Sequence, residues 1–246
     1  MGARLHTVTL AGFKGGVGRT TGAAALAHGL ASLGHSVALI DAGHAVPLQE
    51  DVVSSVRGRG SSPDDSLLQR WAKMLARNYE SGSQIQYIRT TTAAYLEAVL
   101  EQLWREAWQF AVVDTPAHPT ASVFEATAQS TLLLVPARNA ADAIAVSRDL
   151  PEEFLDGYQT LRCVVAGSSD PTLVRQAFAP LPVLKTELPY QPELCASVIS
   201  ASTLAAAPTS NEKWHSGCLS LAREVVELAK RTDERPAQSN LGLMAT

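Results

Sequence analysis

The feature that most constrains the fold is a glycine-rich segment, residues 12–21, with the sequence GFKGGVGRTT. The apolar run before it, residues 8–11, has the character of a buried strand, and the alanine-rich run after it, residues 23–31, favours a helix. A strand, a glycine-rich loop and a helix in this order form the context in which phosphate-binding loops occur. The segment therefore predicts a phosphate-binding loop near the start of the chain.

The residue types of this segment suit an anion. Glycines let backbone N–H groups turn inward around phosphate oxygens, and the N-terminus of the following helix adds partial positive charge. Thr20 stands where a hydroxyl would hold Mg²⁺, and Thr21 is placed to reach a neighbouring phosphate. A glycine-rich turn without a ligand is the alternative, but such a turn needs neither a lysine nor two threonines in this order.

Two positions depart from the general phosphate-loop pattern G-x-x-x-x-G-K-[ST]. Phe13 stands in place of the first glycine, and Arg19 stands in place of the lysine. An arginine keeps the positive charge, but its planar fork of N–H donors differs from a compact ammonium group. A lysine is nevertheless present, because Lys14 lies just before the two adjacent glycines.

Length and composition limit the classes of protein to which this chain can belong. With 246 residues, 46% of them hydrophobic, the chain suits one α/β domain with a sizeable core. The net charge of −4 means that any contact with nucleic acid must come from a local basic patch. No apolar run approaches the ~20 residues that cross a bilayer, and the N-terminal residues show no signal-peptide pattern. The scattered cysteines lack metal-ligand spacing, so we expect reduced, buried thiols and a cytoplasmic protein.

Apolar runs alternate with helical patterns along the chain, which predicts an α/β fold with a doubly wound, mostly parallel sheet flanked by helices. Residues 1–231 are expected to form one domain, with a loop at residues 43–63 and a disordered C-terminal tail at residues 232–246. Further strands are expected at residues 36–41, 84–88, 110–114, 131–136, 161–167 and, as an edge strand, 183–190. Helices are expected from Asp64 or Asp65 as cap to residue 78, from Thr92 to about residue 104, at 140–154, after 168–171, at 192–200 and at 211–231.

Two of the predicted strands end in a carboxylate. Asp41 closes the strand at residues 36–41, and Asp114 follows four apolar residues and precedes a Thr-Pro pair. Ligands bind at the carboxyl ends of strands in open α/β sheets, so both side chains are placed for a nucleotide site. Any buried strand can end in Asp by chance, yet the upstream phosphate loop favours a Walker B strand in which Asp114 orders the water around Mg²⁺.

The order and spacing of these segments resemble the ParA/MinD family of ATPases, whose phosphate loop is a deviant Walker A motif. The resemblance rests on residues 14–21, 39–42 and 112–116, and it extends over roughly residues 5–231. Among subgroups, the chain looks most similar to compact ParA proteins that lack an N-terminal DNA-binding domain and to VirC-type ATPases of conjugative DNA transfer. The likeness to the VirC type rests on Phe13, Arg70 and Trp71.

The resemblance implies a role for each matching position. Lys14 would reach the phosphates of a partner subunit in a nucleotide-sandwich dimer, and Lys14 and Asp41 would form the catalytic set. Thr20, Asp41 and Asp114 would hold Mg²⁺. The residues implied to bind ATP are Lys14, Gly15, Gly16, Val17, Gly18, Arg19, Thr20, Thr21 and, against the adenine, Leu188 and Pro189.

One departure from the family bears on hydrolysis. The family usually carries a second Asp two residues after the one corresponding to Asp41, and that carboxylate positions the attacking water. Here the residue is Gly43. Because phosphoryl transfer to water depends on positioning the nucleophile, we expect slow hydrolysis or none, with nucleotide binding and dimerisation kept. The alternative is that His44 or a partner protein takes over this role.

Basic residues on two predicted helices are candidates for contact with DNA phosphates. A solvated helix face explains the same pattern equally well, although a dimer would double any basic patch. A membrane-binding helix is not expected, because the apolar end of the chain is short and lacks a basic face. The candidate DNA-binding residues are Arg70, Lys73, Arg77, Arg223, Lys230 and Arg231.

The resemblance thus implies an ATP- and Mg²⁺-binding protein that dimerises around the nucleotide and positions DNA, in plasmid or chromosome partition or in conjugative transfer. A partner protein would stimulate or recruit it. The alternative is a ParA-like localisation or scaffold factor of a protein assembly, such as the BcsQ type of cellulose secretion, without DNA binding. A metabolic P-loop enzyme ranks last, because no feature of the sequence marks a small-molecule substrate pocket.

Overall fold

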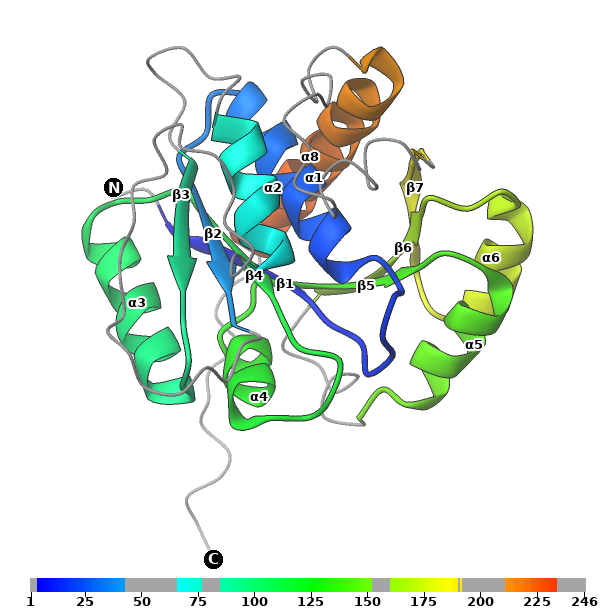
Figure 1. Ribbon diagram of the computed structural model, residues 1–246, viewed down its shortest axis with the longest axis horizontal. Helices are drawn as coiled ribbons and strands as arrows, with labels where there is room; N and C mark the ends of the chain where they lie inside the picture. Colours follow the sequence, from blue (N-terminus) through cyan, green and yellow to red (C-terminus); the bar gives the residue numbers. More distant parts are fainter. Residues whose placement is uncertain are drawn as a thin grey trace, which may run out of the picture.

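A seven-stranded sheet in which all neighbouring strands are parallel forms the centre of the protein (Figure 1). The computed structural model describes residues 4–42, 66–76, 85–151, 160–189, 191 and 211–233. The strand order is β3-β2-β4-β1-β5-β6-β7, so the predicted doubly wound sheet and the edge position of the last strand are confirmed. The strands are β1 His6–Leu10, β2 Val37–Asp41, β3 Ile85–Arg89, β4 Phe110–Asp114, β5 Leu132–Ala137, β6 Thr160–Ala166 and β7 Val183–Leu188.

Helices cover both faces of this sheet (Figure 1). One face carries α1 (Arg19–Ser32), α2 (Leu67–Ala76) and α8 (Glu212–Asp233), which share one apolar core with the sheet. The opposite face carries α3 (Ala93–Arg105), α4 (Ala121–Ala128), α5 (Ala140–Arg148) and α6 (Pro171–Phe178), which pack on it in two further clusters.

Alternate residues of the central strands face opposite helical layers. In β4, Val112 packs in the core shared with α1, whereas Ala111 and Val113 pack on the side of α3. In β2, Leu39 and Ile40 divide in the same way. Strands covered on both faces must be apolar almost throughout, which is why the sequence shows them as continuous apolar runs.

Helix α1, which begins at the phosphate loop, is buried along most of its length between the sheet, α2 and α8. Its small residues let α8 approach closely. A Cβ atom added to Gly29 would lie 2.1 Å from the carbonyl oxygen of Cys218 in α8. The start of α1, and with it the phosphate loop, is therefore anchored by dense packing behind it.

The structure corrects several predicted boundaries. Helix α4 was not predicted; its signal is Thr120, whose side chain caps the helix by accepting from the Val123 amide. The helix predicted at 140–154 ends at Arg148, and α8 continues to Asp233, two residues into the predicted tail. Cys163 and Cys218 are buried free thiols, as expected. The predicted loop 43–63, the predicted helix 192–200, Cys195 and the tail beyond residue 233 lie outside the described residues.

Candidate phosphate and metal site

The residues predicted for the metal come together at the carboxyl edge of the sheet. Asp41 and Asp114 end the adjacent strands β2 and β4 and are register partners. Thr20, in the first turn of α1, donates its hydroxyl to Asp114 Oδ2 over 2.7 Å. The loop after β1 thus delivers the threonine to the carboxylate of the neighbouring strand, β4.

Asp114 is a buried carboxylate, with 7% of its surface exposed. Burial raises the pKa of Asp114 to about 7, the negative charge of Asp41 adds to this shift, and the Thr20 hydrogen bond and Arg19 oppose it. Its Oδ1 atom is buried and has no hydrogen-bond partner among the described residues. Such an orphaned carboxylate oxygen fits a divalent cation or its bound water, either of which would stabilise the ionised form.

The backbone of the loop is shaped for an anion. Gly16 and Gly18 have φ angles of +76° and +104°, a region that favours glycine. Gly18 is also the N-cap of α1, and a Cβ atom there would lie 3.1 Å from the Ala166 side chain of β6. The amide groups of the first turn of α1 therefore face the loop, where an anion would complete their hydrogen bonds.

Arg19 fastens the loop to its surroundings. Its Nε donates to the Thr115 carbonyl over 3.0 Å, and its Nη1 donates to the carbonyls of Lys14, over 2.7 Å, and of Gly12. The residue is 9% exposed, and burial lowers the pKa of its guanidinium while the charge of Asp114 opposes this shift. One planar side chain therefore joins the two ends of the loop to the segment that follows β4.

Lys14 forms an ion pair within its own chain. Its Nζ lies 2.5 Å from Oδ1 of Asp142, in the first turn of α5. Asn139, the N-cap of that helix, donates to the other carboxylate oxygen over 3.1 Å and accepts from the Asp142 amide over 2.8 Å. Sequence reasoning placed Lys14 at a partner subunit, and it missed Asp142, which lies 128 residues further along the chain.

Two further residues of the site were not foreseen. Ser66 and Tyr87 both donate hydroxyl hydrogen bonds to Asp41. Ser66 was also overlooked as the cap of α2, since Asp64 or Asp65 was expected there; its Oγ accepts from the Gln69 amide over 3.1 Å. The Ser-x-x-Gln spacing is a helix-start signal that would have found Ser66.

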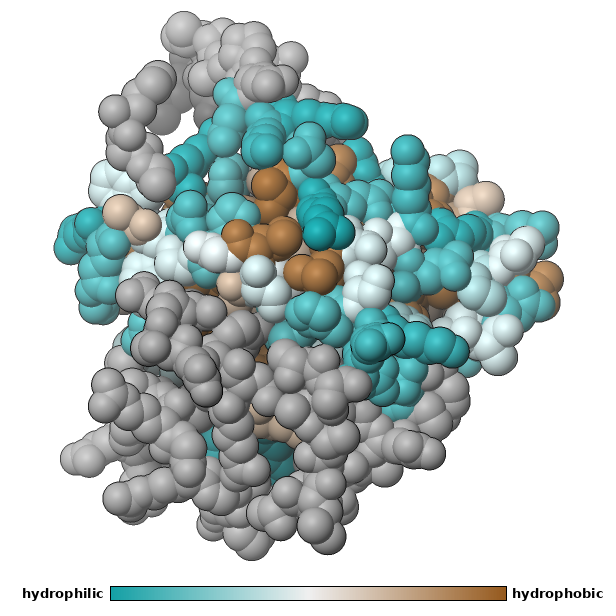
Figure 2. All heavy atoms as spheres, turned by 90° about the horizontal axis from the view of Figure 1, so that it is seen from above, coloured by the Kyte–Doolittle hydropathy of each residue, from teal (hydrophilic) through white to brown (hydrophobic). Residues whose placement is uncertain are grey.

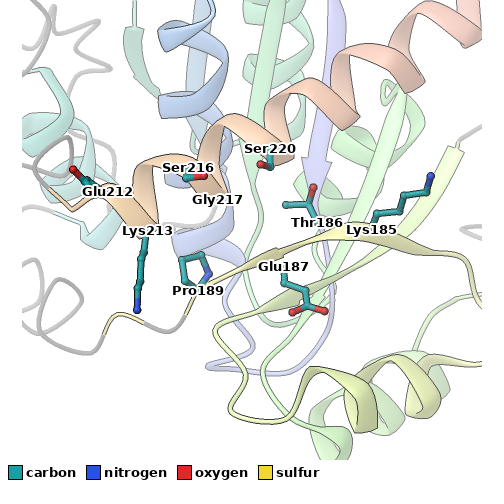
Figure 3. A pocket seen from close by; sticks show the side chains of 9 residues that line it. All are labelled: Lys185, Thr186, Glu187, Pro189, Glu212, Lys213, Ser216, Gly217 and Ser220. Carbon is teal, nitrogen blue, oxygen red and sulfur yellow. The ribbon is translucent and has the colours of Figure 1, made fainter.

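The two residues predicted to contact the adenine, Leu188 and Pro189, lie at the end of the edge strand β7. Leu188 ends β7 and pairs with Ala166 of β6, the residue that approaches Gly18. Pro189 follows it and lines a groove of about 740 Å³ between β7 and the first half of α8 (Figure 3). This groove contains none of residues 12–21, so it is distinct from the phosphate site.

The candidate DNA-binding residues lie on two helices of the same face. Arg70 and Lys73 are partly exposed on α2, while Arg77 lies outside the described residues. Arg223, Lys230 and Arg231 are exposed on α8, where Lys230 pairs with Glu227 over 3.2 Å. Figure 2, which views the molecule from the side of these helices, shows a mainly hydrophilic described surface around a smaller apolar area.

The side chains of the described residues also show whether a metal cluster or a membrane-spanning helix is present among them. They contain no group of three or more His, Cys, Asp and Glu side chains suited to a metal ion, so a metal here would depend on Thr20, single carboxylates and water. Within the same residues, no helix combines the length and apolar character needed to span a bilayer.

Comparisons with known proteins agree with this geometry. A family model described as the CobQ/CobB/MinD/ParA nucleotide binding domain matches residues 8–204. A comparison with curated protein sequences gave no match.

Solved structures share the fold. MinD of Pyrococcus horikoshii, solved with Mg-ADP, has a TM-score of 0.65 at 14% identity, covering 94% of this chain and 100% of that one. The cell division ATPase MinD of Pyrococcus furiosus has a TM-score of 0.63 at 16% identity, and the match covers 93% of this chain and 100% of that one. A putative plasmid partition protein of Borrelia burgdorferi, bound to AMPPNP, has a TM-score of 0.60 at 13% identity, and the match covers 91% of this chain and 99% of that one. Because the family model spans most of the chain and the predicted loop, carboxylates and sheet agree with it, this protein belongs to the CobQ/CobB/MinD/ParA nucleotide-binding family.

Proposed function

We propose that the protein binds ATP together with Mg²⁺ at the loop of residues 12–21. The observation that carries this proposal is the pair formed by Thr20 and Asp114, with a buried carboxylate oxygen left without a partner among the described residues. A hydroxyl and a carboxylate at this place suit Mg²⁺, which keeps several of its waters in protein sites. When bound, the ion would neutralise charge on the phosphates.

Each residue of the site then has a task. Thr20 would contact Mg²⁺, and Asp114 and Asp41 would hold its waters. The free amides of the glycine-rich turn and the start of α1 would bind the phosphates, and Arg19 would keep the turn in shape while adding positive charge. The proposed ATP-binding residues are Lys14, Gly15, Gly16, Val17, Gly18, Arg19, Thr20 and Thr21, with Leu188 and Pro189 beside the adenine.

We further propose that two ATP-bound copies pair across the nucleotides. Lys14 would then leave Asp142 and reach the phosphates of the second copy, an exchange eased by its position, since the side chain is 39% exposed. Hydrolysis would be slow, because Gly43, outside the described residues, offers no carboxylate to position water. The same absence leaves a role for His44 or a partner protein.

The most suitable task for such a dimer is the positioning of DNA in the cytoplasm, in partition or conjugative transfer. In support, basic side chains lie on α2 and α8, and one structural neighbour is described as a plasmid partition protein. The second candidate is a scaffold factor that positions a protein assembly without binding DNA. The Lys230–Glu227 ion pair, which offsets part of the positive charge on α8, favours this alternative.

The test compares nucleotide binding, dimerisation and DNA binding in one set of variants. Calorimetry with ATP and Mg²⁺ should show binding by the wild type and at least tenfold weaker binding by Thr20→Ala. Light scattering should show an ATP-dependent dimer that Lys14→Ala abolishes and the control Lys213→Ala retains. A salt-dependent DNA shift with ATP supports DNA positioning, and dimerisation without it supports the scaffold. Absence of ATP binding would overturn the proposal.

A further inference from the structure

Asp41 is held on one side by two hydroxyl groups. Ser66 Oγ donates to Asp41 Oδ2 over 2.6 Å, and the Tyr87 hydroxyl donates to the same oxygen over 3.1 Å. The two hydroxyl oxygens are themselves 3.2 Å apart. All three residues are buried, with 3%, 6% and 2% of Asp41, Ser66 and Tyr87 exposed. Two donors on one buried oxygen fix the rotation of the carboxylate.

These two donors come from different parts of the fold. Tyr87 belongs to β3, next to the strand that carries Asp41, and burial raises the pKa of its hydroxyl, so the phenol keeps its proton as a donor. Ser66 precedes α2 and caps it, since its Oγ accepts from the Gln69 amide while donating to Asp41. The hydrogen bond of Ser66 therefore joins the first turn of α2 to the metal edge of the sheet.

Helix α2 is in turn joined to α8 and α1 by aromatic contacts. The Trp71 ring of α2 stacks on Trp214 of α8, with centroids 5.4 Å apart and planes inclined by 13°. Trp214 also stacks on His28 of α1, at 5.1 Å. Both tryptophans are almost fully buried, so a displacement of α2 would change the packing of this stack.

We propose that Ser66 and Tyr87 are positioning residues for Asp41, and that Ser66 makes α2 responsive to the occupancy of the metal site. This inference rests on the proposed function, in which Asp41 holds the waters of Mg²⁺. Groups that orient a metal-binding carboxylate affect metal affinity about 10–100-fold. Because one Ser66 hydroxyl both caps α2 and donates to Asp41, a change in what Asp41 binds would be passed to the start of α2, and the reverse would hold by thermodynamic reciprocity.

The arrangement has a consequence for the proposed DNA contact. The candidate residues Arg70 and Lys73 lie on α2, and Arg223 lies on α8. The Ser66 hydrogen bond and the Trp71–Trp214 stack would thus connect the metal edge to both basic helices. Binding of Mg²⁺ and nucleotide would change how these helices are held without any direct contact between ligand and basic residues.

The experiment measures the affinity for Mg²⁺ at saturating ADP, in a Trp104→Phe, Trp108→Phe background that leaves Trp71 and Trp214 as the emitters. Ser66→Ala and Tyr87→Phe should each weaken apparent Mg²⁺ affinity about tenfold. Ser66→Thr, which keeps a hydroxyl and a cap, should remain within about threefold of the parent. Ser130→Ala removes a buried hydroxyl that bonds to Thr9 and not to Asp41. It is the control for general loss of packing and should leave Mg²⁺ affinity unchanged.

Tryptophan emission separates the two parts of the proposal. Mg²⁺ with ADP should change emission in the parent and in Tyr87→Phe, and the change should be lost in Ser66→Ala. If the parent binds no ADP in Mg²⁺, the proposed function fails and this inference falls with it. If the parent binds ADP with Mg²⁺ but both variants have the same Mg²⁺ affinity as the parent, only the inference is overturned. Tyr87→Phe keeps the ring in place, so it decides the positioning role should Ser66→Ala not fold.

Discussion

At the scale of single residues, Arg19 shows why a substitution within a motif has to be judged by its contacts. A lysine in its place could not bond to the carbonyls of Gly12, Lys14 and Thr115 together, because one ammonium group cannot span positions that the Nε and Nη1 atoms reach separately. The bonds of the guanidinium to the Gly12 and Thr115 carbonyls are buried, and so they are protected from water. Arg19 is therefore adapted to this loop rather than a simple stand-in for lysine.

We expect Arg19→Lys to destabilise the protein, although it restores the general phosphate-loop pattern. Buried carbonyls left without donors cost about 1–3 kcal/mol in the free energy of unfolding. Chemical denaturation of the two proteins measures this difference, and calorimetry should show weaker ATP binding as well. Arg148→Lys, the same change at an exposed position of α5, should be nearly neutral. Equal or greater stability of Arg19→Lys would contradict this account of the loop.

At the scale of elements, α1 depends on both its small residues and its buried histidine. Gly29 allows the backbone of α8 to lie against α1, whereas Gly22, earlier in the same helix, faces only the flexible end of the Leu10 side chain. His28 is fully buried and contacts His215 of α8 over 2.9 Å. The packing of α1 against α8 is therefore tight and sensitive to charge.

Gly29→Ala should destabilise the protein by more than about 2 kcal/mol, despite the gain of up to ~1 kcal/mol in helix propensity. The added Cβ would overlap the Cys218 carbonyl, which is backbone and cannot rotate away. Gly22→Ala is the matched control in the same helix, where the Cβ would meet Leu10 Cδ1 at 3.4 Å, and we expect little loss of stability. Thermal unfolding of both variants checks the difference; equal melting temperatures would refute it.

Stability should fall as the pH is lowered from about 6.5 to 4, in part because of His28. Burial, with a smaller effect of His215, lowers the pKa of His28 to about 4. In this range the unfolded chain binds a proton that the folded protein excludes, so acid favours unfolding. The loss of stability is about 2–3 kcal/mol at about 1.4 kcal/mol per pKa unit.

Urea titrations at several pH values should show this slope in the wild type and a shallower one in His28→Gln. His118→Gln, a change at an exposed histidine, serves as the control and should keep the wild-type slope. An unchanged slope in His28→Gln would mean that another group determines the acid sensitivity.

At the scale of the whole molecule, charge determines what the surface can bind. The net charge is −4, so a DNA contact must rely on the local basic side chains of α2 and α8. Acidic neighbours limit this patch, because Glu224 accepts from the Lys185 and Thr186 amides and Glu227 pairs with Lys230. Doubling of the patch in a dimer is therefore central to the DNA proposal.

The double variant Arg70→Ala, Lys73→Ala should weaken DNA binding in the presence of ATP and make it less dependent on salt. Each cation removed from a DNA phosphate makes the slope of log K against log salt shallower by ~0.9, so a dimer without these four cations should differ by roughly 3–4 units. Fluorescence anisotropy at several salt concentrations measures the slope. The control is the double variant Lys185→Ala, Lys213→Ala, which changes two lysines of the groove beside β7 and should leave this slope unchanged. A slope equal to that of the wild type would favour the scaffold alternative.

The sequence by itself determined the sheet, the loop and the two strand-end carboxylates. These features depend on local patterns: apolar runs for strands buried on both faces, glycines before a helix, and Asp41 and Asp114 where the runs stop. That these two side chains lie beside each other also required β2 and β4 to be neighbours in the sheet, and this strand order is a property of the tertiary structure. The cap of α2 and the whole of α4 were missed, because their capping residues, Ser66 and Thr120, each act through a single hydrogen bond.

Only the tertiary structure decided how the functional side chains are held. The partners of Asp41 lie 25 and 46 residues away, and the partner of Lys14 lies 128 residues away. No pattern within a window of sequence records such pairs, because they depend on the packing of α2, β3 and α5 at one edge of the sheet. Local periodicity follows from backbone geometry and burial, whereas hydrogen-bond partners follow from where distant segments meet.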